Sequence, residues 1–135
     1  MIGKGSLRSW AARTLIGLVV LWNLQAAFAF LAAPGQYAPA FELAGVPGQA
    51  AVRGVAVLFI MWNVPYLVAA WQPRRNRLAL AEALGMQLIG LIGEGFILSM
   101  LGAGHAVLRA SILRFITFDA AGLGLLVVAF VMARN

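Results

Sequence analysis

The chain contains no cysteine, which excludes disulfide bonds, thiolate metal sites and cysteine nucleophiles. Charge is also scarce, because only 10 basic and 4 acidic residues occur among 135. A soluble domain of this length needs more charged surface than that to stay dissolved. With 63% hydrophobic residues and a mean hydropathy of +0.93, the sequence indicates a small integral membrane protein without room for a second domain.

Sequence motifs for catalysis are also missing. His105 is the only histidine, so a haem or metal site would lack its other ligands. No serine lies in a nucleophile motif with a base nearby, and the sequence has neither a phosphate loop nor a dinucleotide fingerprint. The signal for a self-contained enzyme is therefore poor, and no covalent or metal cofactor is identified.

Four apolar runs are each long enough to cross a bilayer as a helix, which takes about 20 residues. They cover approximately residues 10–33, 53–71, 78–101 and 110–132. Continuous runs favour helices over barrel strands, which would alternate over about ten residues. We predict a single all-α domain over residues 1–135, an integral membrane four-helix bundle whose second helix is kinked at Pro65.

The first run has a rival interpretation as a cleaved signal peptide, because Ala27-Phe28-Ala29 resembles a cleavage site. The run is longer than a typical signal-peptide core of roughly 7–15 residues, so we favour a retained helix over cleavage within residues 1–29. The next segment, residues 34–52, holds three of the five prolines. It predicts a structured outer loop with a short interfacial helix over residues 39–44.

Basic residues are distributed unevenly between the two sides of the predicted bundle. Seven of the ten share the side of both termini and the 72–77 connection: Lys4, Arg8, Arg13, Arg74, Arg75, Arg77 and Arg134. The positive-inside rule then places both termini in the cytoplasm of a bacterial-type inner (plasma) membrane. Because topology accounts for the net charge of +6, we expect a lipid bilayer and no nucleic acid as partner. A membrane protein partner and a homo-oligomer both stay open.

Three ionisable residues lie inside the last two runs: Glu94, Arg114 and Asp119. Charged side chains are costly at membrane depth, so each needs a partner or a function. If the two spans are antiparallel about a turn near Gly104, facing residues have numbers that sum to about 208. Glu94 and Arg114 meet this condition and predict a salt bridge, which either only fixes helix register or also belongs to a site.

Asp119 lies about 14 Å along the fourth span and about 140° around the helix from Arg114. It therefore needs a different partner, and the candidates are Asn23, Asn63, Gln87 and Arg53. A protonatable carboxylate near the membrane midplane is common in proton-coupled transport and in polar ligand pockets. The structural alternative is a carboxyl hydrogen-bonded to Asn63.

Polar residues also occur at mid-depth in the other spans. Gln87, Gly90, Glu94 and Ile97 follow helical spacing and share one face of the third span. Asn23 and Asn63 indicate a polar interior in the first two spans, or alternatively single interhelical hydrogen bonds. The candidate ligand-binding set consists of the polar side chains expected inside the bundle: Asn23, Asn63, Gln87, Glu94, Arg114 and Asp119.

Three sequence features together resemble the DoxX-like small four-helix membrane proteins. They are a first span that closes in a proline, the loop FELAGVPGQAAVRG that leads into the second span, and the basic connection PRRNR. The resemblance covers the whole topology and implies a four-helix bundle, and some relatives work as subunits or partners of quinone-linked oxidoreductases. Asn63 stands where the resemblance leads us to look for an acidic residue, so no functional residue is transferred.

Three functions are compatible with the sequence. The first is a pocket in the outer half of the bundle that binds a lipophilic or quinone-like ligand, or a subunit that docks onto a larger membrane complex. The second is a proton-coupled small-molecule transporter that uses Glu94 or Asp119. The third is a purely structural subunit. The uneven basic charge argues against dual-topology antiparallel dimers of the small multidrug exporter kind.

Overall fold

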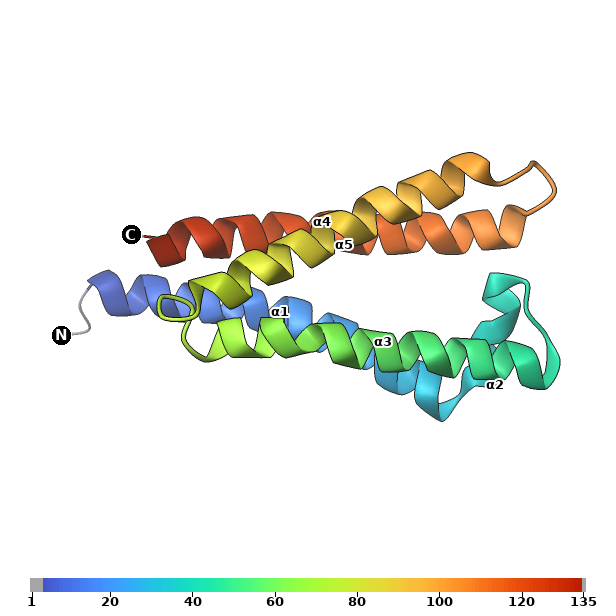
Figure 1. Cartoon of the computed structure of the whole chain (residues 1–135), viewed down its shortest axis with the longest axis horizontal. Coiled ribbons are helices and arrows are strands. Elements are labelled where there is room, and N and C mark those ends of the chain that lie inside the picture. The colour runs from blue at the N-terminus through green and yellow to red at the C-terminus, as the bar shows by residue number, and fades with distance from the viewer. Residues whose placement is uncertain (1–3, 135) are drawn as a thin grey trace.

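The structure, a computed structural model, describes residues 4–134, and of residues 4 and 5 only the backbone. Its long helices are α1 (Lys4–Ala32), α3 (Gly45–Trp71), α4 (Arg77–Met100) and α5 (Ala106–Arg134). All four are long and apolar enough to cross a membrane, and residues 4–134 contain no strand. The predicted all-α four-helix fold of a small membrane protein is confirmed (Figure 1).

The second long helix starts earlier than the sequence predicts. α3 begins at Gly45 rather than near residue 53, so Arg53 lies within it. Pro47 falls in its first turn, where a missing N–H has no partner inside the helix to lose. The glycines and the proline at 45–48 therefore mark the start of a helix and do not belong to a loop. α3 continues past Pro65 as one helix.

The connection between α1 and α3 is structured, as predicted, but its helical part lies elsewhere. It consists of α2 (Pro34–Tyr37) and a short 3-10 helix, η1 (Ala38–Phe41), instead of a helix over residues 39–44. η1 ends at Glu42, which has a left-handed backbone with a φ of 56°. The amide of Leu43 then donates to the carbonyl of Ala38. From this turn the Glu42 side chain reaches His105 and the amide of Leu108.

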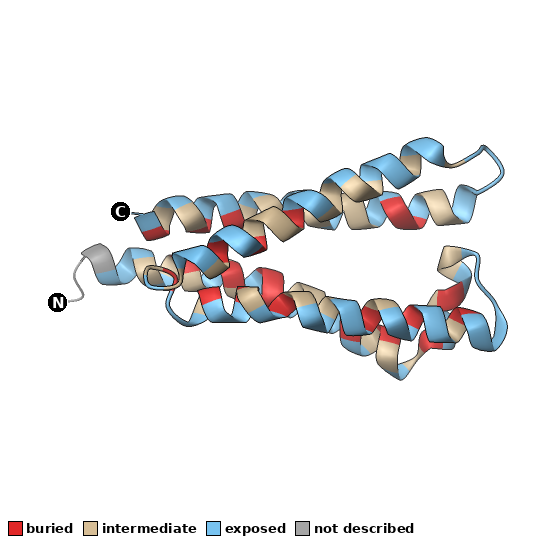
Figure 2. Cartoon of the chain, in the orientation of Figure 1, coloured by how far each residue is buried: buried red, intermediate tan, exposed pale blue. Residues whose placement is uncertain are grey.

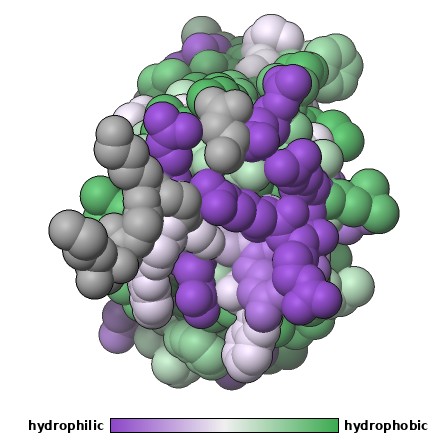
Figure 3. All heavy atoms as spheres, turned by 90° about the vertical axis from the view of Figure 1, so that its left-hand side faces the viewer, coloured by the Kyte–Doolittle hydropathy of each residue, from purple (hydrophilic) through white to green (hydrophobic). Residues whose placement is uncertain are grey.

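The four long helices form a ring in which α1 packs on α3 and α5, and α4 also packs on α3 and α5. α1 begins and α5 ends at the same end of the bundle, beside the turn at residues 72–76 (Figure 1). We call this the terminal end and the opposite one the loop end. Hydrophilic side chains gather on the terminal end (Figure 3). The side of the membrane that each end faces stays a prediction.

The hydrophobic core differs between the two halves of the bundle. In the terminal half, buried residues from all four helices form one cluster, with Ile16, Tyr66, Leu80 and Leu126 among its largest members. Toward the loop end, a second cluster joins α1, α3 and the connecting loop, with Phe115 as the contribution of α5. α4 contributes no residue to this second cluster, and its loop-end half is largely exposed or half-buried (Figure 2). The loop-end half of α4 therefore lies outside both hydrophobic clusters.

Candidate functional site

A cavity of about 440 Å³ occupies the loop-end half of the bundle. Every long helix and the connecting loop contribute to its lining, which falls within residues 22–30, 37–41, 59–62, 86–97 and 111–119. It lies beside the part of α4 that contributes no residue to the second hydrophobic cluster. The cavity is thus a consequence of helix arrangement.

One wall of the cavity is aromatic and centres on Phe30. The ring centroids of Tyr37, Phe41, Phe59 and Phe115 lie 4.8, 5.9, 6.2 and 6.4 Å from that of Phe30. These separations are those of edge-to-face and offset-stacked pairs, which hold one another in fixed orientations. The cavity therefore has a broad apolar surface on which a flat ring can stack.

Two of the four tryptophans also line the cavity. Trp22 packs edge-on against Phe118, with 4.8 Å between ring centroids, and Trp62 packs on Phe59 of the aromatic wall, with 5.4 Å between ring centroids. Trp10 and Trp71, in contrast, are exposed near the terminal end. The tryptophans thus divide into a pair that a bound ligand would contact and a pair that it would not.

The inner end of the cavity is polar and is built around Gln87. The hydroxyl of Tyr66 donates to Gln87 Oε1 at 2.6 Å. Gln87 Nε2 donates in turn to Asp119 Oδ1 at 3.0 Å and to the Asp119 backbone carbonyl at 3.2 Å. Gln87 was one of the four predicted partners of Asp119, and the contact between them is confirmed. Tyr66 was missed, although a tyrosine hydroxyl inside an apolar run requires a partner.

Two glycines give this hydrogen-bonded chain its room. A Cβ added to Gly90 would lie 2.7 Å from Asp119 Oδ2, and one added to Gly122 would lie 2.8 Å from Gln87 Nε2. α4 and α5 approach each other closely here because neither glycine has a side chain. The sequence analysis placed Gly90 on the same face as Gln87 but did not identify Gly122.

The predicted salt bridge between Glu94 and Arg114 is wrong. Among the described residues, the one ion pair within 4.0 Å joins Glu42 to His105. α4 and α5 lie close where Gln87 meets Asp119 and separate toward the loop end (Figure 1). Glu94 and Arg114 instead line the same cavity without meeting, and Glu94 Oε2 is buried with no hydrogen-bond partner in the described chain.

Five of the six candidate ligand-binding residues line the cavity, and Asn63 does not. Asn63 is fully buried, and its Nδ2 donates to the carbonyl of Phe59 within its own helix at 2.7 Å. Its predicted place in the pocket is therefore wrong. The five that do line the cavity are Asn23, Gln87, Glu94, Arg114 and Asp119. Whether they bind a ligand stays a prediction.

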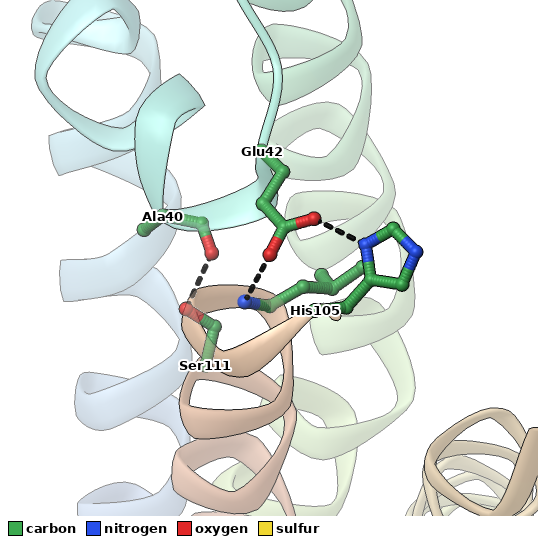
Figure 4. A network of polar contacts seen from close by, with 5 residues as sticks. Ala40, Glu42, His105 and Ser111 are labelled. Carbon is green, nitrogen blue, oxygen red and sulfur yellow. Dashed lines mark hydrogen bonds and ion pairs between the residues drawn. The ribbon is translucent and has the colours of Figure 1, made fainter. Parts of the chain in front are cut away.

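Residues 40–42 of the connecting loop, which we call the roof because Ala40 and Phe41 line the cavity, form hydrogen bonds with the start of α5 (Figure 4). Glu42 Oε2 lies 2.5 Å from His105 Nδ1, and the amide of Leu108 donates to Glu42 Oε1 at 3.2 Å. A carboxylate is favourable at this position because the first amides of a helix lack partners and carry partial positive charge. The hydrogen bond with His105, followed by that from Leu108, lowers the pKa of Glu42 below its ordinary value.

A second contact joins the same two segments. Ser111 Oγ donates to the carbonyl of Ala40 at 2.6 Å, and Ala40 and Phe41 both line the cavity. The sequence interpretation left His105 without a partner. The sequence held one signal for the contact between Glu42 and His105, because Glu42 is the one charged residue of the connecting loop.

Within residues 4–134, no group of three His, Asp or Glu side chains is placed to hold a metal ion. Comparison with protein-family models, curated proteins and solved structures finds no match for this chain. The geometry of the cavity is therefore the basis on which a function can be proposed.

Proposed function

We propose that the cavity binds a lipophilic ligand with a flat ring and hydrogen-bond-accepting oxygens, of the quinone class. The observation that carries this proposal is a single cavity that is lined both by an aromatic wall and by Glu94 and Arg114. Its volume of about 440 Å³ lies within the roughly 300–1,000 Å³ of small-molecule sites.

Two polar side chains of the cavity, the half-buried Glu94 and the exposed Arg114, lack partners that a ligand would supply. No acidic side chain of the described chain lies within 4.0 Å of the Arg114 guanidinium, and Glu94 Oε2 has no partner. An unpaired buried polar atom costs free energy. Arginine carries only donors, and a carboxyl group donates when it holds a proton. A ring with two carbonyl oxygens would accept from both residues while it stacks on the aromatic wall.

The cavity also has an opening that suits a lipid-soluble ligand. Several of its lining side chains are exposed on the lateral surface, among them Ile89, Ile97 and Phe118. These residues belong to membrane-spanning helices, so the opening faces the hydrocarbon region. The terminal half, in contrast, is closed by a core from all four helices. This arrangement supports binding from the bilayer more than passage across it. The DoxX-like resemblance stays a prediction.

Tryptophan fluorescence tests the proposal directly, because quinones quench indole emission at close range. The protein is placed in lipid nanodiscs and titrated with a short-chain benzoquinone. With Trp10→Phe and Trp71→Phe combined, emission comes from Trp22 and Trp62 in the cavity, and we expect saturable quenching. With Trp22→Phe and Trp62→Phe combined, we expect only the weak, non-saturating quenching of collision. Equal curves from the two variants would refute binding in this cavity.

Single substitutions then assign the polar contacts. We expect Arg114→Gln and Glu94→Leu each to weaken quinone binding about tenfold, the effect of losing one hydrogen bond to the ligand. Arg53→Gln removes the same charge as Arg114→Gln from an exposed position outside the cavity and serves as the control. If neither cavity variant weakens binding, the quinone proposal fails. If Asp119→Asn and Glu94→Gln also leave transport unchanged in folded protein, the structural-subunit alternative gains.

A further inference from the structure

The terminal end carries a second hollow, of about 330 Å³, that is unconnected with the proposed quinone site. It lies between the start of α1 and the turn that follows α3, under the hydrophilic face seen in Figure 3. Its lining residues are mostly basic or polar: Ser9, Arg13, Trp71, Gln72, Arg74 and Arg75. Three positive charges thus surround one small concave site.

No acidic side chain balances these charges. The hollow is lined by no aspartate or glutamate, and the one ion pair among the described residues lies at the opposite end of the bundle. Of the four acidic residues, three belong to the loop-end half, at Glu42, Glu94 and Asp119. The fourth, Glu82, is exposed on α4, does not line the hollow and has no ion pair within 4.0 Å among the described residues. The field inside the hollow is therefore positive.

Two arginines at the terminal end, Arg13 in the hollow and Arg77 outside it, already have a structural task. Arg13 Nε donates to the carbonyl of Ala70 in the last turn of α3, and Arg77 donates to the carbonyls of Ala133 and Arg134 at the end of α5. Both satisfy carbonyls that a helix end leaves free. These contacts explain why arginines stand at those two positions.

Arg74 has no such task. Its Nε and Nη2 atoms are buried and have no hydrogen-bond partner in the described chain. Two buried guanidinium donors without an acceptor are unfavourable. Because Nε and Nη2 form one edge of the planar guanidinium, they fit two oxygens of one phosphate. Arg75 is exposed beside them and adds a second positive charge.

We propose that this hollow binds the phosphate of an anionic phospholipid headgroup. The surface around it favours a lipid over a soluble anion, because large apolar side chains are exposed at the same depth. Leu7, Trp10, Trp71 and Leu78 are 67, 59, 71 and 75% exposed, and can contact acyl chains and the glycerol region. Tryptophan is enriched at this interfacial depth, and basic pockets between membrane helices are suited to anionic headgroups.

Native mass spectrometry of the full chain released from detergent tests the proposal. The probes are phosphatidylglycerol, phosphatidylcholine and inorganic phosphate, each titrated separately. We expect phosphatidylglycerol to bind at least fivefold more tightly than phosphatidylcholine, and inorganic phosphate not to bind at matched concentration. Arg74→Gln should weaken phosphatidylglycerol binding about fivefold or more, whereas Arg53→Gln, which removes a charge at the opposite end, should not.

Two outcomes would overturn the proposal. An equal loss in the Arg74 and Arg53 variants would show attraction by net charge without a site, and binding of inorganic phosphate in place of lipid would assign the hollow to a soluble anion. If Arg74→Gln fails to fold, Arg75→Gln replaces it, because Arg75 lines the same hollow from an exposed position. Unchanged lipid binding in folded Arg75→Gln would likewise count against the site.

Discussion

Gln87 is the residue on which the polar interior depends. It accepts from Tyr66 of α3 and donates to Asp119 of α5 while it belongs to α4. An amide can do this because it carries a donor and an acceptor on adjacent atoms. A single side chain therefore joins three helices at the inner end of the cavity.

Replacing Gln87 by leucine removes its three interhelical hydrogen bonds and leaves the buried Tyr66 hydroxyl unpaired. We expect the free energy of unfolding to fall by about 1–2 kcal/mol, the upper range for hydrogen bonds between membrane helices. Unfolding by a denaturing detergent from bicelles measures this change. Tyr66→Phe, which keeps the Gln87–Asp119 bond, should cost less. A Gln87→Leu variant as stable as the parent would contradict the bridging role.

Gly90 and Gly122 provide a second test at the same place. An alanine methyl at either position would collide with Asp119 or Gln87, so we expect Gly90→Ala and Gly122→Ala to displace these side chains and break their hydrogen bond. Gly93→Ala and Gly95→Ala are matched controls in α4, because a Cβ there meets nothing within 4 Å. The controls should be neutral or stabilising, since alanine favours helix over glycine by up to about 1 kcal/mol. The same unfolding assay separates the two pairs, and equal behaviour would contradict the close approach.

Sequence reasoning found most of the polar residues but misjudged their pairing. Summing residue numbers assumes helix axes that stay parallel, which holds where Gln87 meets Asp119 and fails at Glu94 and Arg114. A small change in the angle between α4 and α5 decides which residues touch. That angle depends on packing along the whole helix and is not encoded in the spacing of charges.

At the scale of elements, the connection between α1 and α3 acts as a cap on α5. Glu42 reaches the first turn of α5 and contacts both His105 and the Leu108 amide. The first described turn of α5 contains no acidic residue of its own, so the capping charge comes from another segment. The roof of the cavity and the start of α5 are therefore stabilised together.

This capping contact should depend on pH. Because the pKa of Glu42 is lowered in the folded protein, its stabilisation is complete above the ordinary value of 4.5 and is lost as the pH falls through the lower, folded value. We expect the exchange protection of the Leu108 amide, corrected for the intrinsic rate, to fall in that acid range. Hydrogen exchange measures it, and Glu42→Gln is the control that should lack the step. An identical acid response in both proteins would contradict the prediction.

The elements themselves were predictable where long apolar runs dominate and were not where proline and glycine occur. Four spans follow from run length alone. The start of α3 at Gly45 does not, because Pro47 is favourable in a first helical turn and unfavourable further along. The sequence alone does not show whether a proline lies in the first turn of a helix or further along it. The contact of Glu42 with α5 joins segments more than sixty residues apart, which local pattern cannot reveal.

At the scale of the whole molecule, a core from all four helices closes the interior of the terminal half, whereas the loop-end half contains the cavity. Both ends of the described chain lie at the closed, basic half, which the positive-inside rule places toward the cytoplasm. The loop-end half, which contains the cavity, then faces the outer leaflet. This orientation is predicted from the distribution of arginines.

The orientation can be tested without altering any native thiol, because the chain has no cysteine. We expect Ala103→Cys, in the turn between α4 and α5, to react with a membrane-impermeant maleimide in intact bacterial cells with a permeable outer membrane. Ser6→Cys, in the exposed start of α1, should react only after the inner membrane is broken. The positive charges at the terminal end give the physical reason. The reverse labelling pattern would place both termini outside.

The lateral opening has a consequence for the strength of binding that this protein needs. A molecule confined to the membrane is distributed through a very small volume, so its local concentration far exceeds its average in the cell. Occupancy depends on the ratio of that concentration to the dissociation constant. A weak site beside the acyl chains can therefore stay filled, and its performance is set by discrimination among lipophilic molecules and by dwell time. Affinities measured for it are meaningful as mole fractions in lipid rather than as concentrations in water.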